Sequence, residues 1–346
     1  MLYVGVFIIS LLLAGLLSPL ARKVGHVAGA GRRRPRGNAA PLIGGLAMAA
    51  SCLPFLPAAG FLPSTTVHAY AGASALLLCA GALDGHVRIP TWLWLCVEAA
   101  AAVIVVRLGG IRIATLGSLF GHGPLAVGTL AAPLAGLAIV GIAHAFRRLD
   151  AVNGLAGAVA AATLATMLLA GVWSGYTALV PAMLALLASV SGFLVWNARL
   201  PGRPRTPPRL GAEGSTWLGF SLACLAIALT QGAPGNLHPI VLGWLFAVPV
   251  LDSMALLIRR AGRGRPASGD GRRQLHHRLC ELGCSGNEAV VILALLTVLP
   301  GVTGLWLDQA GMPDELSALL GLGALVLTVG LIAFHRGSGA GASDPG

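Results

Sequence analysis

Three aspartates stand at the borders of long apolar segments, where they could do acid–base or phosphate chemistry. Asp84 follows one apolar run, Asp150 precedes another in RRLDAVNGL, and Asp252 lies in VPVLDSMALL. An acid in a membrane helix costs about 2.5–3.5 kcal/mol on insertion scales, so each needs a partner or a function. Any one of them alone fits a helix cap. Three together, with Arg147 and Arg148 nearby, predict a polar cleft at one membrane boundary.

Two loops add groups that suit a phosphorylated ligand. Residues 197–220 read NARLPGRPRTPPRLGAEGSTWLGF, in which a glycine turn is expected to open a helix at Ser215. The unpaired N–H groups of such a helix start favour anions. Residues 259–288 place His276 and His277 among seven arginines, a combination that suits a diphosphate. A solvated basic loop is the alternative for this second stretch.

Glu98 is different, because it lies near the middle of an apolar segment. A carboxyl at that depth could mark a transport path. It could also be protonated and hydrogen-bonded to a neighbouring helix, which is favoured because no other acid shares its depth. A transporter is the least favoured class, because the other polar residues gather at one membrane edge.

The elements that must position these residues are membrane helices. The 346 residues are 56% hydrophobic and 10% charged, with a mean hydropathy of +0.83, whereas soluble domains carry about 25% charged residues. Apolar runs near 20 residues can cross a hydrocarbon core of about 30 Å. Eleven such segments are expected, at 2–21, 42–62, 66–83, 90–107, 125–142, 153–170, 177–196, 215–230, 238–258, 289–306 and 316–334.

This pattern predicts an all-α integral membrane protein with about eleven (10–11) transmembrane helices. Residues 1–336 are expected to form a single polytopic membrane domain, and the Gly/Ser/Ala-rich residues 337–346 a flexible cytoplasmic tail. Residues 108–124, with alternating apolar residues and glycines, are expected to form a small hairpin outside the membrane.

The basic residues predict the orientation. With the N-terminus periplasmic and the C-terminus cytoplasmic, 21 of the 23 Lys and Arg residues fall on the inner side, as the positive-inside rule requires. The cleft then faces the cytoplasm from a bacterial inner (plasma) membrane. Topology alone accounts for the net charge of +11, so no nucleic acid is needed as a partner. Contact with membrane lipid headgroups or phosphorylated substrates is the additional interpretation.

The order of these motifs resembles the polyprenyl-phosphate N-acetylhexosamine-1-phosphate transferases, the WecA-like and MraY-like membrane enzymes of glycosyltransferase family 4. The resemblance runs from PLIGG at 41–45 to the loop ending near Gly283. The family's Asp-Asp pair appears as Asp84-Gly85, and its N-A-x-N-x-x-D-G-x-D-G-L segment as residues 144–155, with Asp150 and Asn153 at the two acidic positions. Its P-x-L-D motif appears at 249–252, and its H-x-H-H motif appears at 274–277 as Gln274-Leu275-His276-His277, with two of the three histidines kept.

The resemblance implies a fold of ten or eleven helices around a cytoplasm-facing cleft. It also implies transfer of a sugar 1-phosphate, such as N-acetylhexosamine 1-phosphate, from a UDP-sugar to polyprenyl (undecaprenyl) phosphate, with release of UMP, in cell-envelope polysaccharide synthesis. Mg²⁺ or Mn²⁺ would bridge the diphosphate. The implied site comprises Asp84 and Asp150 as catalytic residues, Asn153, Asp252, His276, His277 and Arg278 in substrate binding, and Glu213 at the metal.

Several family positions are altered. His144 and Arg147 replace the two asparagines, and Ala212 stands where the family has a metal-binding aspartate. Glu213 is one position away, about 100° around a helix, so it replaces that aspartate only if the turn is rebuilt. Two hypotheses follow. The chain is an active transferase, or it is a catalytically degenerate relative that binds a lipid or nucleotide sugar or serves as an assembly partner. A homodimer is left open.

Overall fold

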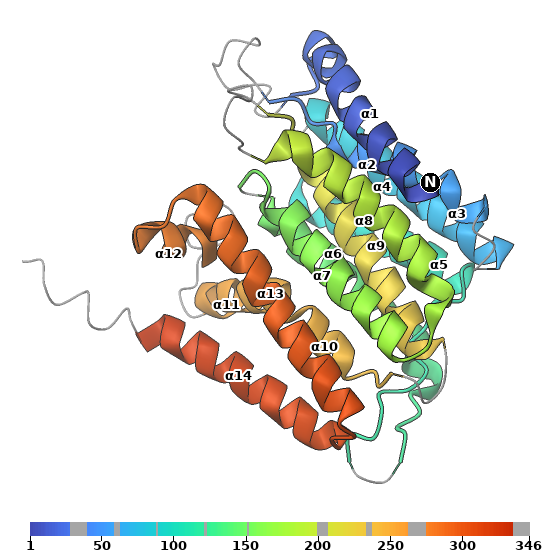
Figure 1. Ribbon diagram of the computed structural model, residues 1–346, viewed down its shortest axis with the longest axis vertical. Helices are drawn as coiled ribbons and strands as arrows, with labels where there is room; N and C mark the ends of the chain where they lie inside the picture. Colours follow the sequence, from blue (N-terminus) through green and yellow to red (C-terminus); the bar gives the residue numbers. More distant parts are fainter. Residues whose placement is uncertain are drawn as a thin grey trace, which may run out of the picture.

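The computed structural model describes residues 1–27, 40–58, 63–87, 89–120, 123–150, 152–198, 207–232, 237–261 and 275–334 (Figure 1). The predicted tail 337–346 lies outside these ranges. The helices are α1 (Leu2–Val24), α2 (Gly44–Cys52), α3 (Phe55–Ala58), α4 (Ser64–Val87), α5 (Thr91–Arg107), α6 (Ala131–Leu149), α7 (Leu155–Trp173), α8 (Val180–Asn197), α9 (Gly211–Gln231), α10 (Val241–Leu245), α11 (Ala247–Ala261), α12 (Leu275–Glu281), α13 (Gly286–Gln309) and α14 (Asp314–Phe334).

The prediction of an all-helical, multi-pass membrane protein is confirmed. Seven helical segments in the described ranges are long and apolar enough to cross a membrane. Each of the eleven expected segments contains helix, but two are broken, into α2 and α3 and into α10 and α11. Pro54 and Pro249 lie at or next to these breaks, where each lacks the N–H that would continue the helix. The number of spans and their orientation stay predictions.

Helix α9 forms the centre of the bundle. Of its apolar window 83% is buried, against 22% for α1, and it packs against α6, α4, α2 and α7. In Figure 1, α9 lies inside the bundle, with α1 at one side of the bundle and α13 and α14 at the other. A Cβ added at Gly219 of α9 would lie 2.8 Å from Cα of Ala143 in α6. Glycine at this crossing lets the two backbones approach closely, as small residues do between membrane helices.

The PLIGG segment has a structural role at the end of the bundle where α1, α4 and α6 end and α9 begins, here called the site end. Residues 40–44 lie beside residues 207–210, and Leu42 forms a parallel bridge with Arg209. The N–H groups of Ile43 and Gly44 donate to the carbonyl of Arg209 at 3.3 and 3.1 Å. A Cβ at Gly45 would lie 2.6 Å from Cα of Gly214. These contacts fix the start of α9 against the start of α2.

The opposite end of the bundle carries the predicted hairpin. Thr115 and Ala126 form an antiparallel bridge. The N–H of Leu116 donates to the carbonyl of Leu125 at 3.1 Å, and the N–H of Leu125 donates to Gly117 at 2.8 Å. The expectation of a small hairpin here is confirmed for the residues that the structure describes.

Candidate functional site

A buried ion pair lies at the start of α9. Glu213 is 4% exposed, and its Oε1 lies 3.7 Å from Nε2 of His26, just beyond α1. The hydrogen bond to Glu213 raises the pKa of His26, and burial opposes this in part. Glu213 therefore favours the cationic form of the imidazole.

Two glycines of α4 make room for this pair. A Cβ at Gly81 would overlap with Cβ of Glu213, and a Cβ at Gly85 would lie 2.5 Å from the ring of His26. Gly85 stands where the family has its second aspartate. The ring of His26 therefore occupies the space that a side chain at position 85 would need, directly beside Asp84.

The expected helix start at Ser215 is wrong, because α9 begins at Gly211. Gly211 has φ +78°, a left-handed conformation that glycine adopts without strain, so the chain turns into the helix four residues earlier. Glu213 therefore lies in the first helical turn. Its carboxylate folds back over Gly211, where an added Cβ would lie 2.6 Å from both carboxylate oxygens.

Asp150 lies at the end of α6, close to the same helix start. Burial raises the pKa of its carboxyl to about 7, and Glu213 adds to this, whereas Arg209 and the backbone N–H of Gly211 oppose it. Arg209 also donates from Nη2 to the backbone carbonyl of Asp150 at 2.6 Å. The predicted residues Asp150 and Glu213 thus share one environment. Asn153 is half-buried in the turn between α6 and α7.

Asn197 holds this turn in place and was missed by the sequence analysis. It is 1% exposed. Its Oδ1 accepts the N–H of Gly154 at 2.7 Å, and its Nδ2 donates to the carbonyl of Pro208 at 2.7 Å. One signal pointed to it, since it is the first polar residue after the apolar run that ends at Trp196.

Asp252 and His276 form a second cluster. The N–H of Leu275 donates to Oδ1 of Asp252 at 2.9 Å. His276 is 2% exposed, and burial lowers its pKa to about 4, so its imidazole is neutral at physiological pH. Its ring lies 4.0 Å from that of His277. His277 and the next residue, Arg278, are partly exposed, so the predicted diphosphate contact depends on them more than on His276.

The two clusters meet at the turn between α6 and α7. His276 and Asp252 share an apolar pocket with Leu149 and Leu155, which flank that turn. The structure therefore places Asp150 between the two clusters. The catalytic and binding roles of all these residues stay predictions.

The predicted metal site is not formed by protein groups alone. In the part of the chain that the structure describes, no three His, Cys, Asp or Glu side chains lie together as metal ligands. Mg²⁺ is often held by one or two carboxylates together with water and substrate phosphates. The described side chains therefore do not form a metal site of three or more ligands. Binding of Mg²⁺ or Mn²⁺ stays a prediction.

Glu98 has neighbours other than those expected. Its side chain faces α6, as a hydrogen bond to a neighbouring helix would require. Oε2 lies 3.4 Å from Nδ1 of His144, and Oε1 lies 3.7 Å from Nη1 of Arg147. In the part of the chain that the structure describes, neither oxygen has a hydrogen-bond partner, so the expected hydrogen bond to a neighbouring helix is not formed there.

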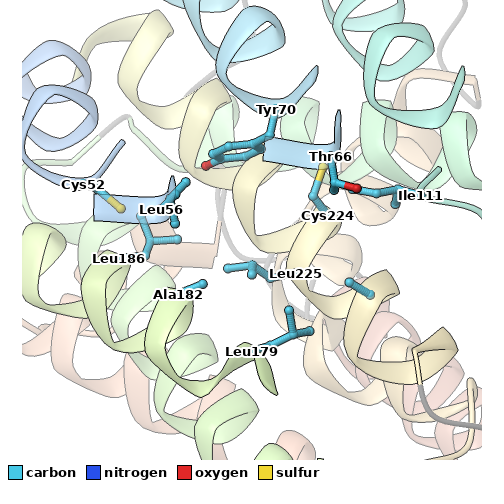
Figure 2. Close-up of a pocket in the computed structure, with 11 residues that line it drawn as sticks. Cys52, Leu56, Thr66, Tyr70, Ile111, Leu179, Ala182, Leu186, Cys224 and Leu225 are labelled. Atoms are coloured by element: carbon cyan, nitrogen blue, oxygen red, sulfur yellow. The ribbon is translucent and has the colours of Figure 1, made fainter. Parts of the chain in front are cut away.

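Two cavities differ in their lining. A groove of about 250 Å³ between α1, α2 and α4 is lined by apolar side chains and ends at His26 and Glu213. A smaller cavity of about 50 Å³ lies deeper and is lined by Cys52, Thr66, Tyr70, Cys224 and apolar side chains (Figure 2). This smaller cavity has no charged group on its wall, so it does not suit a phosphate. Of these two cavities, the groove is the one that adds charged side chains, His26 and Glu213, to an apolar wall.

Comparison with known proteins identifies related chains. The sequence pattern of glycosyl transferase family 4 matches residues 67–230. The undecaprenyl-phosphate alpha-N-acetylglucosaminyl 1-phosphate transferase of Escherichia coli (strain K12) is 25% identical over 313 residues, covering 90% of this chain and 84% of that protein. Its namesake in Salmonella typhimurium is 27% identical over 301 residues, covering 86% and 81%. A probable undecaprenyl-phosphate N-acetylglucosaminyl 1-phosphate transferase of Bacillus subtilis is 25% identical over 310 residues, covering 88% and 84%.

Proposed function

Because this chain belongs to glycosyl transferase family 4, we propose that it is a membrane transferase of sugar 1-phosphates. An oxygen of a polyprenyl phosphate attacks the β-phosphorus of a UDP-sugar. The bond between that phosphorus and the bridging oxygen breaks, and UMP leaves with the bridging oxygen. The product is a polyprenyl diphosphate sugar. N-acetylhexosamine is the proposed sugar and undecaprenyl phosphate the proposed acceptor, because the relatives' names carry both.

The observation that carries this proposal is the groove that ends at the His26–Glu213 pair. An isoprenoid chain needs an apolar wall, whereas its phosphate needs a cation and an anion-binding helix start. The groove offers the apolar wall, and His26, whose cationic form Glu213 favours, lines it together with Glu213 in the first turn of α9. Asp84 precedes Gly85 near the end of α4, where its Oδ1 accepts the N–H of Ile89 at 2.5 Å, and we assign it to the phosphate because Gly85 contacts His26.

The protein side chains have separable roles in this proposal. Asp84 accepts a proton from the lipid phosphate or orients it. Asp150, whose raised pKa keeps it near the point of half-protonation at neutral pH, suits proton exchange with a phosphate oxygen. His277 and Arg278 bind the diphosphate from the side of α12. Positioned cations offset charge that develops as the phosphoryl group transfers.

The site end faces the cytoplasm of a bacterial inner membrane in this proposal. UDP-sugars are made in the cytoplasm, so the donor must arrive from that side. The distribution of Lys and Arg supports the same orientation.

The direct test is release of UMP by the purified full-length protein in lipid nanodiscs. We expect release when undecaprenyl phosphate is combined with UDP-N-acetylglucosamine or UDP-N-acetylgalactosamine, and none when either substrate is left out. Parallel reactions with Mg²⁺, Mn²⁺ or EDTA test the predicted metal requirement. No release with a panel of UDP-sugars under all three conditions would refute the transferase proposal.

A protein that binds these ligands without turnover is the second candidate. Ala212 in place of the family's metal-binding aspartate favours it. In that case UDP-sugar raises the melting temperature without release of UMP, and turnover requires Ala212→Asp together with Gly85→Asp. Turnover by the unmodified chain would exclude it.

A further inference from the structure

A buried carboxylate on α5 has no role in the site described so far. Glu98 is 1% exposed, and neither of its oxygens has a hydrogen-bond partner among the described residues. A buried charge is tolerated only when other charges compensate for it. The compensating groups here are His144 and Arg147 of α6, at 3.4 and 3.7 Å.

Two side chains of α5 hold the guanidinium of Arg147. Trp94 and Glu98 are four residues apart and so share one face of α5. The guanidinium carbon of Arg147 lies 4.5 Å from the centre of a ring of Trp94, within the range of a cation–π contact. The carboxylate of Glu98 binds it at the same time. A long, flexible side chain is thereby fixed in one place.

Arg147 also belongs to the surroundings of the site. It interacts electrostatically with Asp84 as well as with Glu98, and its side chain is 18% exposed. A guanidinium carries five N–H donors in a rigid fork. Its contact with Glu98, at 3.7 Å, is longer than a hydrogen bond, and Nη1 has no hydrogen-bond acceptor in the described part of the chain. Because Nη1 is itself buried, the N–H groups available to another anion are the other ones of this 18% exposed side chain.

We propose that Glu98 is a positioning residue of the transferase site: together with Trp94 it holds Arg147 beside Asp84, where the guanidinium binds a phosphate oxygen of the nucleotide sugar. This inference rests on the proposed function. It assigns a role to a carboxylate that would otherwise be a membrane-buried acid with a purely structural ion pair. It also assigns the nucleotide sugar, rather than the lipid phosphate, to this side of Asp84.

The variant Glu98→Gln tests the proposal, because it keeps the size of the side chain and removes its charge. We expect the KM for the UDP-sugar to rise about tenfold with kcat changed less than about threefold, since a charge-assisted hydrogen bond to the donor is lost in both the bound state and the transition state. The KM for undecaprenyl phosphate should stay unchanged. Glu315→Gln, an acid at the start of α14 outside the site, is the matched control and should leave both values unchanged.

A double-mutant cycle shows whether Glu98 acts through Arg147. Arg147→Gln should raise the KM for the UDP-sugar more than Glu98→Gln does, and the double variant should match Arg147→Gln alone, because the two residues act as one unit. If Glu98→Gln fails to fold, Trp94→Phe tests the same support, because phenylalanine keeps the packing and weakens the cation–π contact. A rise of about threefold in the same KM is then expected.

Some outcomes would overturn the inference while leaving the transferase proposal intact. These are an unchanged KM for the UDP-sugar in folded Glu98→Gln or Trp94→Phe, or a rise in the lipid KM instead. If the unmodified protein binds the UDP-sugar but releases no UMP, the transferase proposal fails, and the inference is decided by whether the Kd for the UDP-sugar rises about tenfold in Glu98→Gln. If it neither binds nor turns over the UDP-sugar, both proposals fail.

Discussion

The two ends of the helix bundle both place acids beside histidines and bind some of these acids to backbone N–H groups, but they differ in the buried polar atoms that are left without a partner. At the end that carries the hairpin, Asp314 accepts the backbone N–H of Ser118 at 2.5 Å. Asp308 accepts the backbone N–H of His238 at 3.1 Å and lies 2.8 Å from Nδ1 of its ring. At the site end, buried polar atoms of Glu98, Arg147 and His276 have no hydrogen-bond partner among the described residues.

The difference separates structural from functional charge. Asp308 and Asp314 hold the hairpin and the segment before α10 to the ends of α13 and α14, and their hydrogen-bonding capacity is used within the protein. Buried polar groups are normally satisfied in this way. Among the groups left unsatisfied at the site end, the guanidinium of Arg147 is a donor that a phosphorylated ligand would satisfy under the proposed function, and functional sites are where a sequence is expected to depart from ideal packing.

The largest expected effect is a loss of activity when an acid of the site end is changed. Asp84→Asn keeps the shape of the side chain and removes its charge, so UMP release should fall by about 10²–10⁴-fold, the range of acid–base catalysis. The melting temperature should fall as well, because Oδ1 of Asp84 accepts the N–H of Ile89, so activity is compared per folded molecule. Steady-state kinetics and a melting curve on the same preparation check this. A variant that keeps more than half of the unmodified activity would remove Asp84 from the proposed site.

A second variant tests whether the ring of His26 fills the space that a side chain at position 85 would need. Gly85→Asp should destabilise the fold by about 1–3 kcal/mol, as overpacking does, because its Cβ would lie 2.5 Å from the ring of His26. His26→Ala in the same chain should recover most of that loss. Gly72→Ala, on the same helix with nothing within 4 Å of its added Cβ, is the control for denaturation measurements. Equal stability of the two glycine variants would contradict the packing described.

The opposite end should respond in stability alone. Asp314→Asn weakens the acceptor for the N–H of Ser118, so the free energy of unfolding should fall by about 1–3 kcal/mol, the usual effect of a weakened buried hydrogen bond. UMP release per folded molecule should not change. Thermal or denaturant unfolding, with activity normalised to folded protein, measures both. A loss of kcat in the folded variant would show that this end is not purely structural.

The last expected effect is a pH dependence of stability from Asp150. Its pKa is about 7 in the folded protein against an ordinary 3.8, so between these values the folded state holds a proton that the unfolded chain has released. Stability from this group is therefore present at low pH and falls as the pH rises from about 4 to about 7. Melting temperatures measured in EDTA at pH 5 and pH 8 should differ less for Asp150→Asn than for the unmodified protein.

If the two proteins instead showed the same difference between pH 5 and pH 8, Asp150 would be ionised over the whole range and exposed to solvent. Asp150 would then no longer count among the buried charged groups of the site end, whereas the ion pairs of Glu213 and Glu98 would still count.

Much of the fold could be predicted from residue types alone. Apolar length predicted the helices, and the prolines near 54 and 249 lie where two of them break. Alternating glycines predicted the hairpin at 108–124. The acids at 84, 150 and 252 could be placed near helix ends because charge is costly deeper in the membrane. Each of these inferences needs only the local sequence and the thickness of a bilayer.

The contacts between helices could not be predicted from the sequence in this way. A membrane helix is apolar around its whole circumference, so its sequence carries no stripe that shows which side faces which neighbour. The sequence therefore did not reveal that Glu98 faces Arg147, that the ring of His26 lies against Gly85, or that His276 is buried and neutral. It also misplaced the start of α9, because a glycine with positive φ lets a helix begin earlier than its apolar run.

What the sequence by itself determined is a multi-pass helical protein with its acids and most of its cations gathered near one set of helix ends, since the energy of placing charge in lipid depends on depth and hardly on fold. Only the tertiary structure decided which charges meet, because the pairing of residues more than a hundred positions apart, such as His26 and Glu213, depends on how helices rotate and cross. That rotation is set by close contacts of small residues, such as Gly45 with Gly214 and Gly219 with Ala143.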